Sequence, residues 1–280
     1  MSDASVAQIE RDLKEQWTQM AESTQKEGQL AVMRTCVMNL IAYTRDPESS
    51  AEASRQLSEV ASHHPARTII VSTNSEAPEP MLDAVVSAFC SIFGGGRKQV
   101  CCEQILLRAQ GDRLNQIPSL IRPLLIPDLP TVLWWRDQIP FEDSLFDDFL
   151  NTADRVILDS ARLPKPAEQL AQIAALVQKE RQWTAFSDLN WARLNPWRLS
   201  MARLYDVPDY RPYLSTVNRI DILGFDPARN SVSTQGLFLG CWLASRLKWT
   251  AVSKPRATAT TWDMDFDTGE HALRMHISAG

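Results

Sequence analysis

The chain has 280 residues, of which 44% are hydrophobic and 22% are charged, so it can bury the core of one large domain or two small ones. Its formal net charge of -5 argues against a dedicated nucleic-acid binder, because such proteins neutralise phosphates with surplus Lys and Arg. No apolar run approaches the roughly 20 residues that a membrane-spanning helix needs, so the sequence predicts no membrane segment.

The amino-terminal stretch and the cysteines both favour the cytoplasm. The sequence "MSDASVAQIERDLKEQW" is acidic and polar where a secretory signal is basic and then apolar. The five cysteines form no CxxC motif, and Cys101 and Cys102 are adjacent, a pattern that suits neither a disulfide framework nor a zinc site. We therefore expect a cytoplasmic protein whose cysteines are buried free thiols.

The first part of the chain alternates helix and strand patterns. Apolar residues recur at helical spacing through residues 3–27, which predicts a helix that ends at Gly28. The run 35–44 then predicts a strand, the segment from Pro47 to about His64 a helix, and "ARTIIVS" (66–72) a second strand. Such a β-α-β unit favours parallel pairing with a right-handed crossover.

Residues 84–111 predict two strands around the loop Gly94–Lys98. Three glycines and two cations are compatible with phosphate binding, but phosphate cradles lead from a strand into a helix, whereas β-like sequence follows here, so we favour a hairpin. The rest of this part predicts a helix at 114–126, a strand at 127–136, a helix at 141–153 and a strand at 154–160. This alternation favours an α/β sheet with helices on its faces.

The segment "ARLPKP" (161–166) predicts a domain boundary, because two prolines within three residues resist both helix and central strand. We expect an α/β fold with two α/β domains, each a mixed sheet with packed helices. The predicted divisions are an N-terminal helix (1–30), an N-terminal α/β domain (31–161) and a C-terminal α/β domain (162–280).

The second part is predicted to begin with a helix at 167–183. Asn195 is then expected to cap a helix that starts at Pro196 and turns Trp197, Met201, Leu204 and Tyr205 inward. The remaining predictions are a strand within 211–225, a mostly buried helix at 233–249, and a hairpin at 260–278 that turns at Thr268–Gly269.

Familiar catalytic and metal-binding patterns are absent from the sequence. It contains no HExxH, GxSxG, Walker or GxGxxG motif, so we expect no metal, no cofactor and no catalytic residues. Asp263, Asp265 and Asp267 have the spacing that puts carboxylates on one face of a strand, as a cation site or an acid/base pair would need. A hydrated sheet edge gives the same pattern, and we favour that interpretation.

Two stretches are unusually rich in tryptophan and arginine. Trp134 and Trp135 are adjacent on a strand, so they face opposite sides of the sheet. Both are buried if the sheet is covered on both faces; otherwise one is exposed beside Arg136, a composition typical of a protein-protein hot spot or a sugar platform.

The second stretch is "DLNWARLNPWR" (188–198). A helix entry explains its tryptophans as packing residues, with the aspartate capping the helix or pairing with the first arginine, but it leaves both arginines poorly explained. It lies in a basic segment, Lys179–Arg256, which has twelve Lys/Arg against six Asp/Glu. This asymmetry can steer an acidic partner, although solvated arginines explain it almost as well. The candidate partner-binding residues of the two stretches are Trp134, Trp135, Arg136, Asp188, Trp191, Arg193, Trp197 and Arg198.

Several segments in order resemble the glucose-6-phosphate dehydrogenase assembly protein family, OpcA. They are "SHHPARTIIVS", "GRKQVCCEQILLRAQG", "PLLIPDLPTVLWW", "ADRVILDS" and "DLNWARLNPWR" followed by "ARLYD", and the similarity runs from about residue 31 to beyond 226. The resemblance implies a non-enzymatic cytoplasmic protein that binds glucose-6-phosphate dehydrogenase, promotes its assembly and activates it, in the oxidative pentose phosphate pathway that yields NADPH. It brings no catalytic residues.

A different class of function remains open. A sugar-phosphate or nucleotide-binding α/β protein would use the Gly94–Lys98 loop for the phosphate and the tryptophans to stack a sugar. The two hypotheses differ in what the isolated chain should bind.

Overall fold

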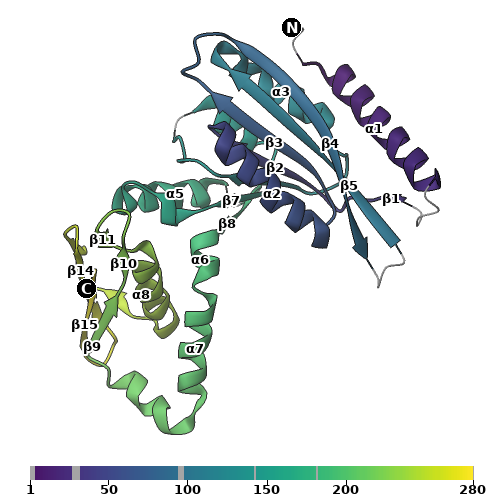
Figure 1. Cartoon of the computed structure of the whole chain (residues 1–280). Coiled ribbons are helices and arrows are strands. Elements are labelled where there is room, and N and C mark those ends of the chain that lie inside the picture. The colour runs from purple at the N-terminus through teal and green to yellow at the C-terminus, as the bar shows by residue number, and fades with distance from the viewer. Residues whose placement is uncertain (1–3, 27–31, 94–97, 142, 181, 280) are drawn as a thin grey trace. The chain divides into compact units, whose positions relative to one another are not determined.

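The computed structural model describes residues 4–26, 32–93, 98–141, 143–180 and 182–279 (Figure 1). The chain divides into two compact units, the first made of Met1–Leu158 and Gln172–Ser187 and the second of Asp159–Ala171 and Asp188–Gly280. Within the described ranges, no helix combines the length and the apolar character that crossing a bilayer requires. The expected α/β class, with mixed sheets and packed helices in two parts, is confirmed.

The first unit contains an eight-stranded sheet and its covering helices. Its helices are α1 (Val6–Lys26), α2 (Pro47–His63), η1 (Gly111–Gln116), α3 (Ile117–Ile121), η2 (Arg122–Leu124) and α4 (Ser144–Leu150). Its strands are β1 (Val32–Arg34), β2 (Met38–Thr44), β3 (Ala66–Asn74), β4 (Met81–Phe93), β5 (Lys98–Gln110), β6 (Thr131–Trp135), β7 (Arg155–Leu158) and β8 (Ala185–Asp188).

The strand order is β1-β5-β3-β2-β6-β7-β8, with β4 paired to β5. The parallel pairing of β2 with β3 across α2 is confirmed, with Ile41 opposite Ile69. β4 and β5 form the expected antiparallel pair, although residues 94–97 of the predicted loop lie outside the described residues. Instead of one helix at 114–126 there are three short turns, because Pro118 and Pro123 each remove a helical N–H donor.

Both faces of this sheet are covered. Leu40 and Ala42 of β2 pack with Ala53 and Leu57 of α2 on one face, as Figure 1 shows from the position of α2. The intervening Ile41 is buried on the other face, since successive strand residues point to opposite sides. α1 is held there by a hydrogen bond from Trp17 Nε1 to Glu103 Oε2, 3.0 Å long. The N-terminal helix is therefore part of the first unit.

The division into units differs from the single predicted boundary at residues 161–162. Helix α5 (Pro166–Glu180) begins in the second unit and ends in the first, and β8 then extends the sheet of the first unit beyond β7. The prolines of "ARLPKP" do end regular structure locally. Buried contacts made further along the chain, such as those of Ile173, return the polypeptide to the first unit.

The expectation of buried free thiols is wrong for the two cysteines of a disulfide, and of the other three Cys36 is partly exposed and Cys241 is exposed. Cys90 and Cys101 face each other across the β4–β5 pair and form a disulfide. An antiparallel register brings such opposed side chains together, and the sequence spacing alone did not indicate it. Cys102 remains a buried thiol, and its burial raises its pKa.

The second unit is a small sheet with one long helix against it. Its helical elements are η3 (Ser160–Arg162), the start of α5, α6 (Leu189–Arg193), α7 (Asn195–Asp206), η4 (Pro208–Ser215) and α8 (Thr234–Leu247). Its strands are β9 (Arg219–Leu223), β10 (Phe225–Asp226), β11 (Ser231–Val232), β12 (Thr250–Ala251), β13 (Arg256–Ala257), β14 (Thr261–Asp267) and β15 (Ala272–Ser278).

The predicted terminal hairpin is confirmed as β14 and β15, with Gly269 at a φ of +88° in the turn. Apolar residues of both strands, among them Met275 and Ile277, form the core with α8. The helix approaches closely because it presents glycines: a Cβ on Gly240 would lie 2.4 Å from Met275 Sδ.

Candidate functional site

The first tryptophan pair is part of the core of the first unit. Trp135 is 2% exposed and stacks on Tyr43, with ring centroids 3.9 Å apart. Phe146 and Phe149 of α4 meet it edge-on. Trp135 Nε1 also donates to the carbonyl of Gln138 at 2.9 Å. As a surface contact Trp135 is ruled out in this conformation, because helices cover both faces of the sheet.

Trp134 and Arg136 lie together on the opposite face of β6. The guanidinium of Arg136 is 4.2 Å from the centre of the Trp134 ring, and it forms an ion pair with Glu52 of α2 at 3.0 Å. The side chain of Arg136 is only 4% exposed. This arginine therefore fastens α2 to β6 rather than presenting charge to a partner.

The second stretch enters helix α6 directly from β8. Asp188 caps α6, its carboxylate accepting from the backbone N–H of Asn190 at 2.8 Å and of Ser160 at 3.1 Å. Asn190 is fully buried and donates to the hydroxyls of Ser160 and Thr234. These bonds fix the start of α6 against η3 and α8, so Asp188 serves the local fold.

Of the two roles expected for Asp188, capping the helix is confirmed, and Arg193 pairs with Asp159 instead. Both terminal nitrogens of the guanidinium reach the Asp159 carboxylate, at 2.7 and 2.9 Å. Burial by itself would raise the pKa of Asp159, but the hydrogen bonds and charge of Arg193 outweigh it and hold that pKa below its ordinary value. The pair ties α6 to η3.

Trp191 and Arg198 form a stacked pair on the surface of the second unit. The guanidinium lies 3.6 Å from the centre of the Trp191 ring, and its Nη1 donates to the Trp191 carbonyl at 2.9 Å. Phe238 of α8 meets the other part of the ring edge-on. The Trp191 ring is thus held in place by Arg198 and Phe238 and remains partly exposed to solvent.

The predicted inner face of α7 is wrong for Trp197 and Leu204, which are 64% and 49% exposed. α7 and η4 bury no residue at all. Met201 and Tyr205 are half-buried. The apolar spacing is that of an amphipathic helix, but in the second unit no described element covers this face.

Asn195 is also not the helix cap. It is the first residue of α7, because α6 ends immediately before it and Leu194 keeps helical backbone angles as the N-cap. The carbonyl of Leu194 accepts from the N–H of Arg198. Two short helices therefore follow one another with no extended residue between them.

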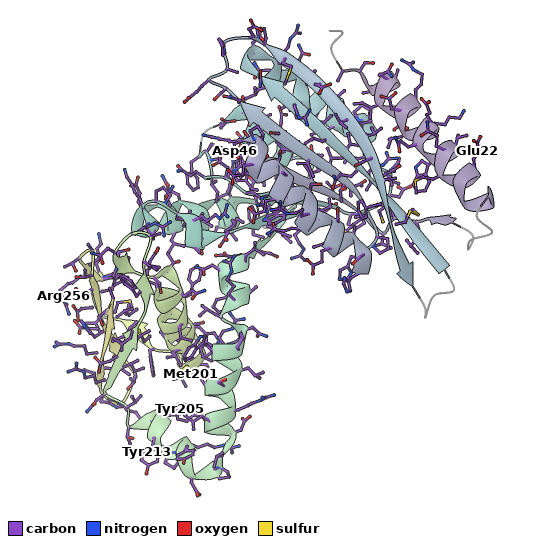
Figure 2. All side chains as sticks on the ribbon, viewed as in Figure 1. Glu22, Asp46, Met201, Tyr205, Tyr213 and Arg256 are labelled. Carbon is purple, nitrogen blue, oxygen red and sulfur yellow. A yellow bond between two sulfur atoms is a disulfide. The ribbon has the colours of Figure 1, made fainter. Side chains whose placement is uncertain are left out.

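We call residues 191–213, which comprise most of α6, α7 and most of η4, the arm. Figure 2 shows its side chains, with Met201, Tyr205 and Tyr213 labelled. Its exposed large apolar residues are Trp191, Trp197, Leu199, Leu204, Val207, Tyr210 and Tyr213. The arm has four arginines against two aspartates. Large apolar side chains gathered among arginines are typical of protein-protein interfaces.

The sequence patterns indicated only part of this surface. Leu199, Val207, Tyr210 and Tyr213 were not singled out, although their apolar character in a segment with two aspartates and four arginines was a usable signal. The structure groups Trp191, Arg193, Trp197 and Arg198 of the predicted set in the arm. It places Trp134, Trp135 and Arg136 in the first unit.

At the position where an α/β sheet would bind a phosphate, the chain carries paired charged side chains of its own. Strand order reverses between β2 and β6, the position at which such sheets hold ligands. There Asp46 caps α2, accepting from the N–H of Ser49 at 2.6 Å, and Arg45 is paired with Asp137. The backbone N–H of Ser49 at the start of α2 is thus already bonded to a carboxylate of the chain.

Two of the three aspartates of β14 pair with basic side chains, and the third, Asp267, accepts from the backbone N–H of Gly269. Asp263 lies 3.0 Å from His276, and Asp265 pairs with Arg256 at 2.8 Å and Arg274 at 3.2 Å. The part of the chain that the structure describes contains no group of three metal-ligating side chains. The expected sheet edge is wrong, because β14 pairs with β12 and β13 on one side and with β15 on the other.

Comparisons with known proteins identify both parts of the chain. Residues 57–175 match the family model for the glucose-6-phosphate dehydrogenase subunit N-terminal domain of the OpcA type, and residues 184–278 match the corresponding C-terminal domain. The chain is 35% identical to the OxPP cycle protein OpcA of Synechocystis sp. over 233 residues, covering 83% of this chain and 46% of that protein.

Two further relatives carry the same name. The protein of Nostoc punctiforme is 34% identical over 70% of this chain and 40% of its own length, and that of Synechococcus elongatus is 30% identical over 69% and 42%. The chain spans less than half the length of these curated relatives. With the two domain models matched in order along the chain, it belongs to the OpcA family.

Proposed function

We propose that this protein binds glucose-6-phosphate dehydrogenase through the arm and promotes its active state, as a non-enzymatic factor of the oxidative pentose phosphate pathway. The proposal rests on family membership for the partner and on the arm for the contact. The matching domain models are described as parts of a subunit of that dehydrogenase, and the relatives are named as proteins of this pathway.

The exposed apolar surface of the arm is the single observation that supports the arm as the contact site. A folded surface helix normally buries its apolar face, yet α7 leaves Trp197 and Leu204 exposed. Trp, Tyr and Arg are the residues that most often dominate binding energy at interfaces. The arm supplies all three on a base fixed by the Arg193–Asp159 pair and by Asn190.

The charge of the arm also indicates which kind of surface on the dehydrogenase it would bind. With Arg193, Arg198, Arg203 and Arg211 against Asp206 and Asp209, the arm is basic although the whole chain is acidic. We expect an apolar patch with acidic groups around it on the dehydrogenase, and an association rate that falls as salt is added.

Activation requires a difference in affinity between two states of the partner. A ligand that binds both states equally shifts nothing, whereas a preference of about 100-fold for the active state supplies about 2.7 kcal/mol. The protein therefore needs no catalytic group of its own. It acts by contact with a dehydrogenase conformation or oligomer that is already competent.

The experiment is an assay of the cognate dehydrogenase by NADPH formation at increasing ratios of this protein, over a range of glucose 6-phosphate concentrations. A saturable fall in KM or rise in kcat is expected, together with co-elution of the two proteins in size-exclusion chromatography. Co-elution with unchanged kinetics would refute activation. Neither co-elution nor a kinetic change would refute the proposed partner.

A further inference from the structure

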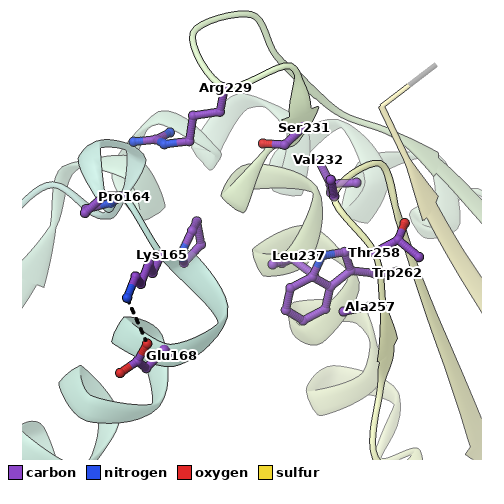
Figure 3. Close-up of a pocket in the computed structure, with 12 residues that line it drawn as sticks. Pro164, Lys165, Glu168, Arg229, Ser231, Val232, Leu237, Ala257, Thr258 and Trp262 are labelled. Carbon is purple, nitrogen blue, oxygen red and sulfur yellow. Dashed lines mark ion pairs between the residues drawn. The ribbon is translucent and has the colours of Figure 1, made fainter.

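The second unit contains a pocket that is separate from the arm. It has a volume of about 650 Å³ and lies between the start of α5, the β10–β11 turn, α8 and β14 (Figure 3). Pockets that hold small molecules typically measure about 300–1,000 Å³ and combine an apolar wall with a few polar groups. This pocket has that composition.

One wall is aromatic and apolar. Trp262 of β14 and Leu237 of α8 line it, and Figure 3 shows the indole ring beside Leu237, facing the interior of the pocket. Trp262 packs against the core of the second unit and so is fixed in place, while it remains partly exposed. A fixed, partly exposed indole is a platform on which the flat face of a sugar or a base can stack.

A guanidinium is positioned across the top of the pocket. Arg229 Nη1 donates to the carbonyl of Ala161 at 3.0 Å and pairs with Asp226. Those two bonds use the hydrogens of Nη1, which leaves Nη2 and Nε with three N–H donors. A guanidinium held at one nitrogen presents its remaining edge in the geometry that suits phosphate oxygens.

Two further polar groups border the same space. Lys165 is 77% exposed, and its ammonium is 4.0 Å from Glu168, a separation at which a surface ion pair contributes little. Lys165 can therefore turn toward a bound anion at small cost. Ser231 also lines the pocket, and within the described ranges its hydroxyl has no hydrogen-bond partner.

We propose that this pocket binds a phosphate monoester carried on a ring, with the ring on Trp262 and the phosphate between Arg229 and Lys165. Sugar phosphates and mononucleotides share this chemistry, and both are small enough for the volume. Asp226 and Glu168 balance the two cations, so recognition depends on the directed N–H groups of Arg229 and on the ring together. Phosphate alone and a neutral sugar alone each satisfy only half of the site.

The site does not depend on the dehydrogenase. All its residues belong to the second unit, and the arm contributes none of them. The test therefore uses the full chain by itself. Its failure would leave the proposed partner untouched, and failure of the dehydrogenase assay would leave this pocket untouched.

Isothermal titration of the full chain with four probes tests the proposal: glucose 6-phosphate, AMP, glucose and inorganic phosphate. We expect glucose 6-phosphate or AMP to bind at least tenfold more tightly than both glucose and phosphate. The two phosphorylated probes distinguish a sugar site from a base site. Binding of phosphate alone with equal affinity would overturn the ring contact, and equal binding of glucose would overturn the anion contact. No heat from any probe at millimolar concentration would overturn the site.

Matched lysine variants locate the bound phosphate. Lys165→Gln should weaken binding of the better probe by three- to tenfold. Lys179→Gln is the control, because that lysine is also 77% exposed beside one glutamate but lies outside the pocket. Equal affinities for the two variants would refute the position of the phosphate. Both substitutions are exposed, so the fold is retained, and circular dichroism verifies this.

Discussion

Replacing Trp197 by alanine should weaken binding of the dehydrogenase without unfolding the protein. A tryptophan can bury about 150–250 Å² at an interface, so a residue that is 64% exposed has about 100–160 Å² available. At about 25 cal/mol per Å² this area corresponds to about 2.5–4 kcal/mol. After the cost of ordering the interface we expect a loss of about 2–3 kcal/mol, or about 30- to 150-fold in Kd.

The assay is a titration of the dehydrogenase by biolayer interferometry or by the activation curve. Trp183→Ala is the matched control, because Trp183 is 79% exposed but lies outside the arm. The Trp183→Ala variant should bind the dehydrogenase with the same Kd as the natural protein. Thermal unfolding of Trp197→Ala should be unchanged within about 0.5 kcal/mol, as is usual for an exposed site. If both tryptophan variants bind equally well, the arm is not the contact and the reasoning from its exposed apolar face is refuted.

Three further predictions concern stability. Trp135→Ala should cost about 3–5 kcal/mol in chemical unfolding, because it empties a fully packed aromatic site; a loss under 1 kcal/mol would contradict its assignment to the core. Gly240→Ala should cost about 1–3 kcal/mol, since the added methyl meets Met275, whereas Ser245→Ala on the exposed side of α8 should be neutral in the same thermal scan. Arg193→Gln should destabilise the protein at neutral pH and lose its effect in acid.

The direction of that pH dependence follows from the lowered pKa of Asp159. A carboxyl group whose pKa is depressed in the folded state contributes stability at pH values above its ordinary pKa and loses that contribution as the pH falls through the depressed value. The melting temperatures of the natural protein and of Arg193→Gln should therefore differ at pH 7 and converge once the pH falls below the depressed pKa of Asp159. A constant difference across this range would exclude the pair as its cause.

Local sequence patterns predicted most of the regular elements. The 3.6-residue apolar period gave α1 and α8, continuous apolar runs gave β2 and β3, and a glycine in the turn gave the β14–β15 hairpin. These predictions succeed because each pattern depends only on residues that lie within one helix turn or one strand of each other. The family resemblance likewise came from segments of contiguous sequence, and both domain models agree with it.

Other features depended on residues that are distant in the chain. Trp135 and Trp197 each precede an arginine in the sequence, yet one is buried and the other exposed, because helices cover both faces of β6 whereas no described element of the second unit covers α7. The partner of Arg193, the Cys90–Cys101 disulfide and the return of residues 172–187 to the first unit are also set by long-range packing. The sequence by itself therefore determined most of the elements and the family. Only the tertiary structure decided which aromatic surface is free to bind, because exposure depends on which other elements pack against a residue.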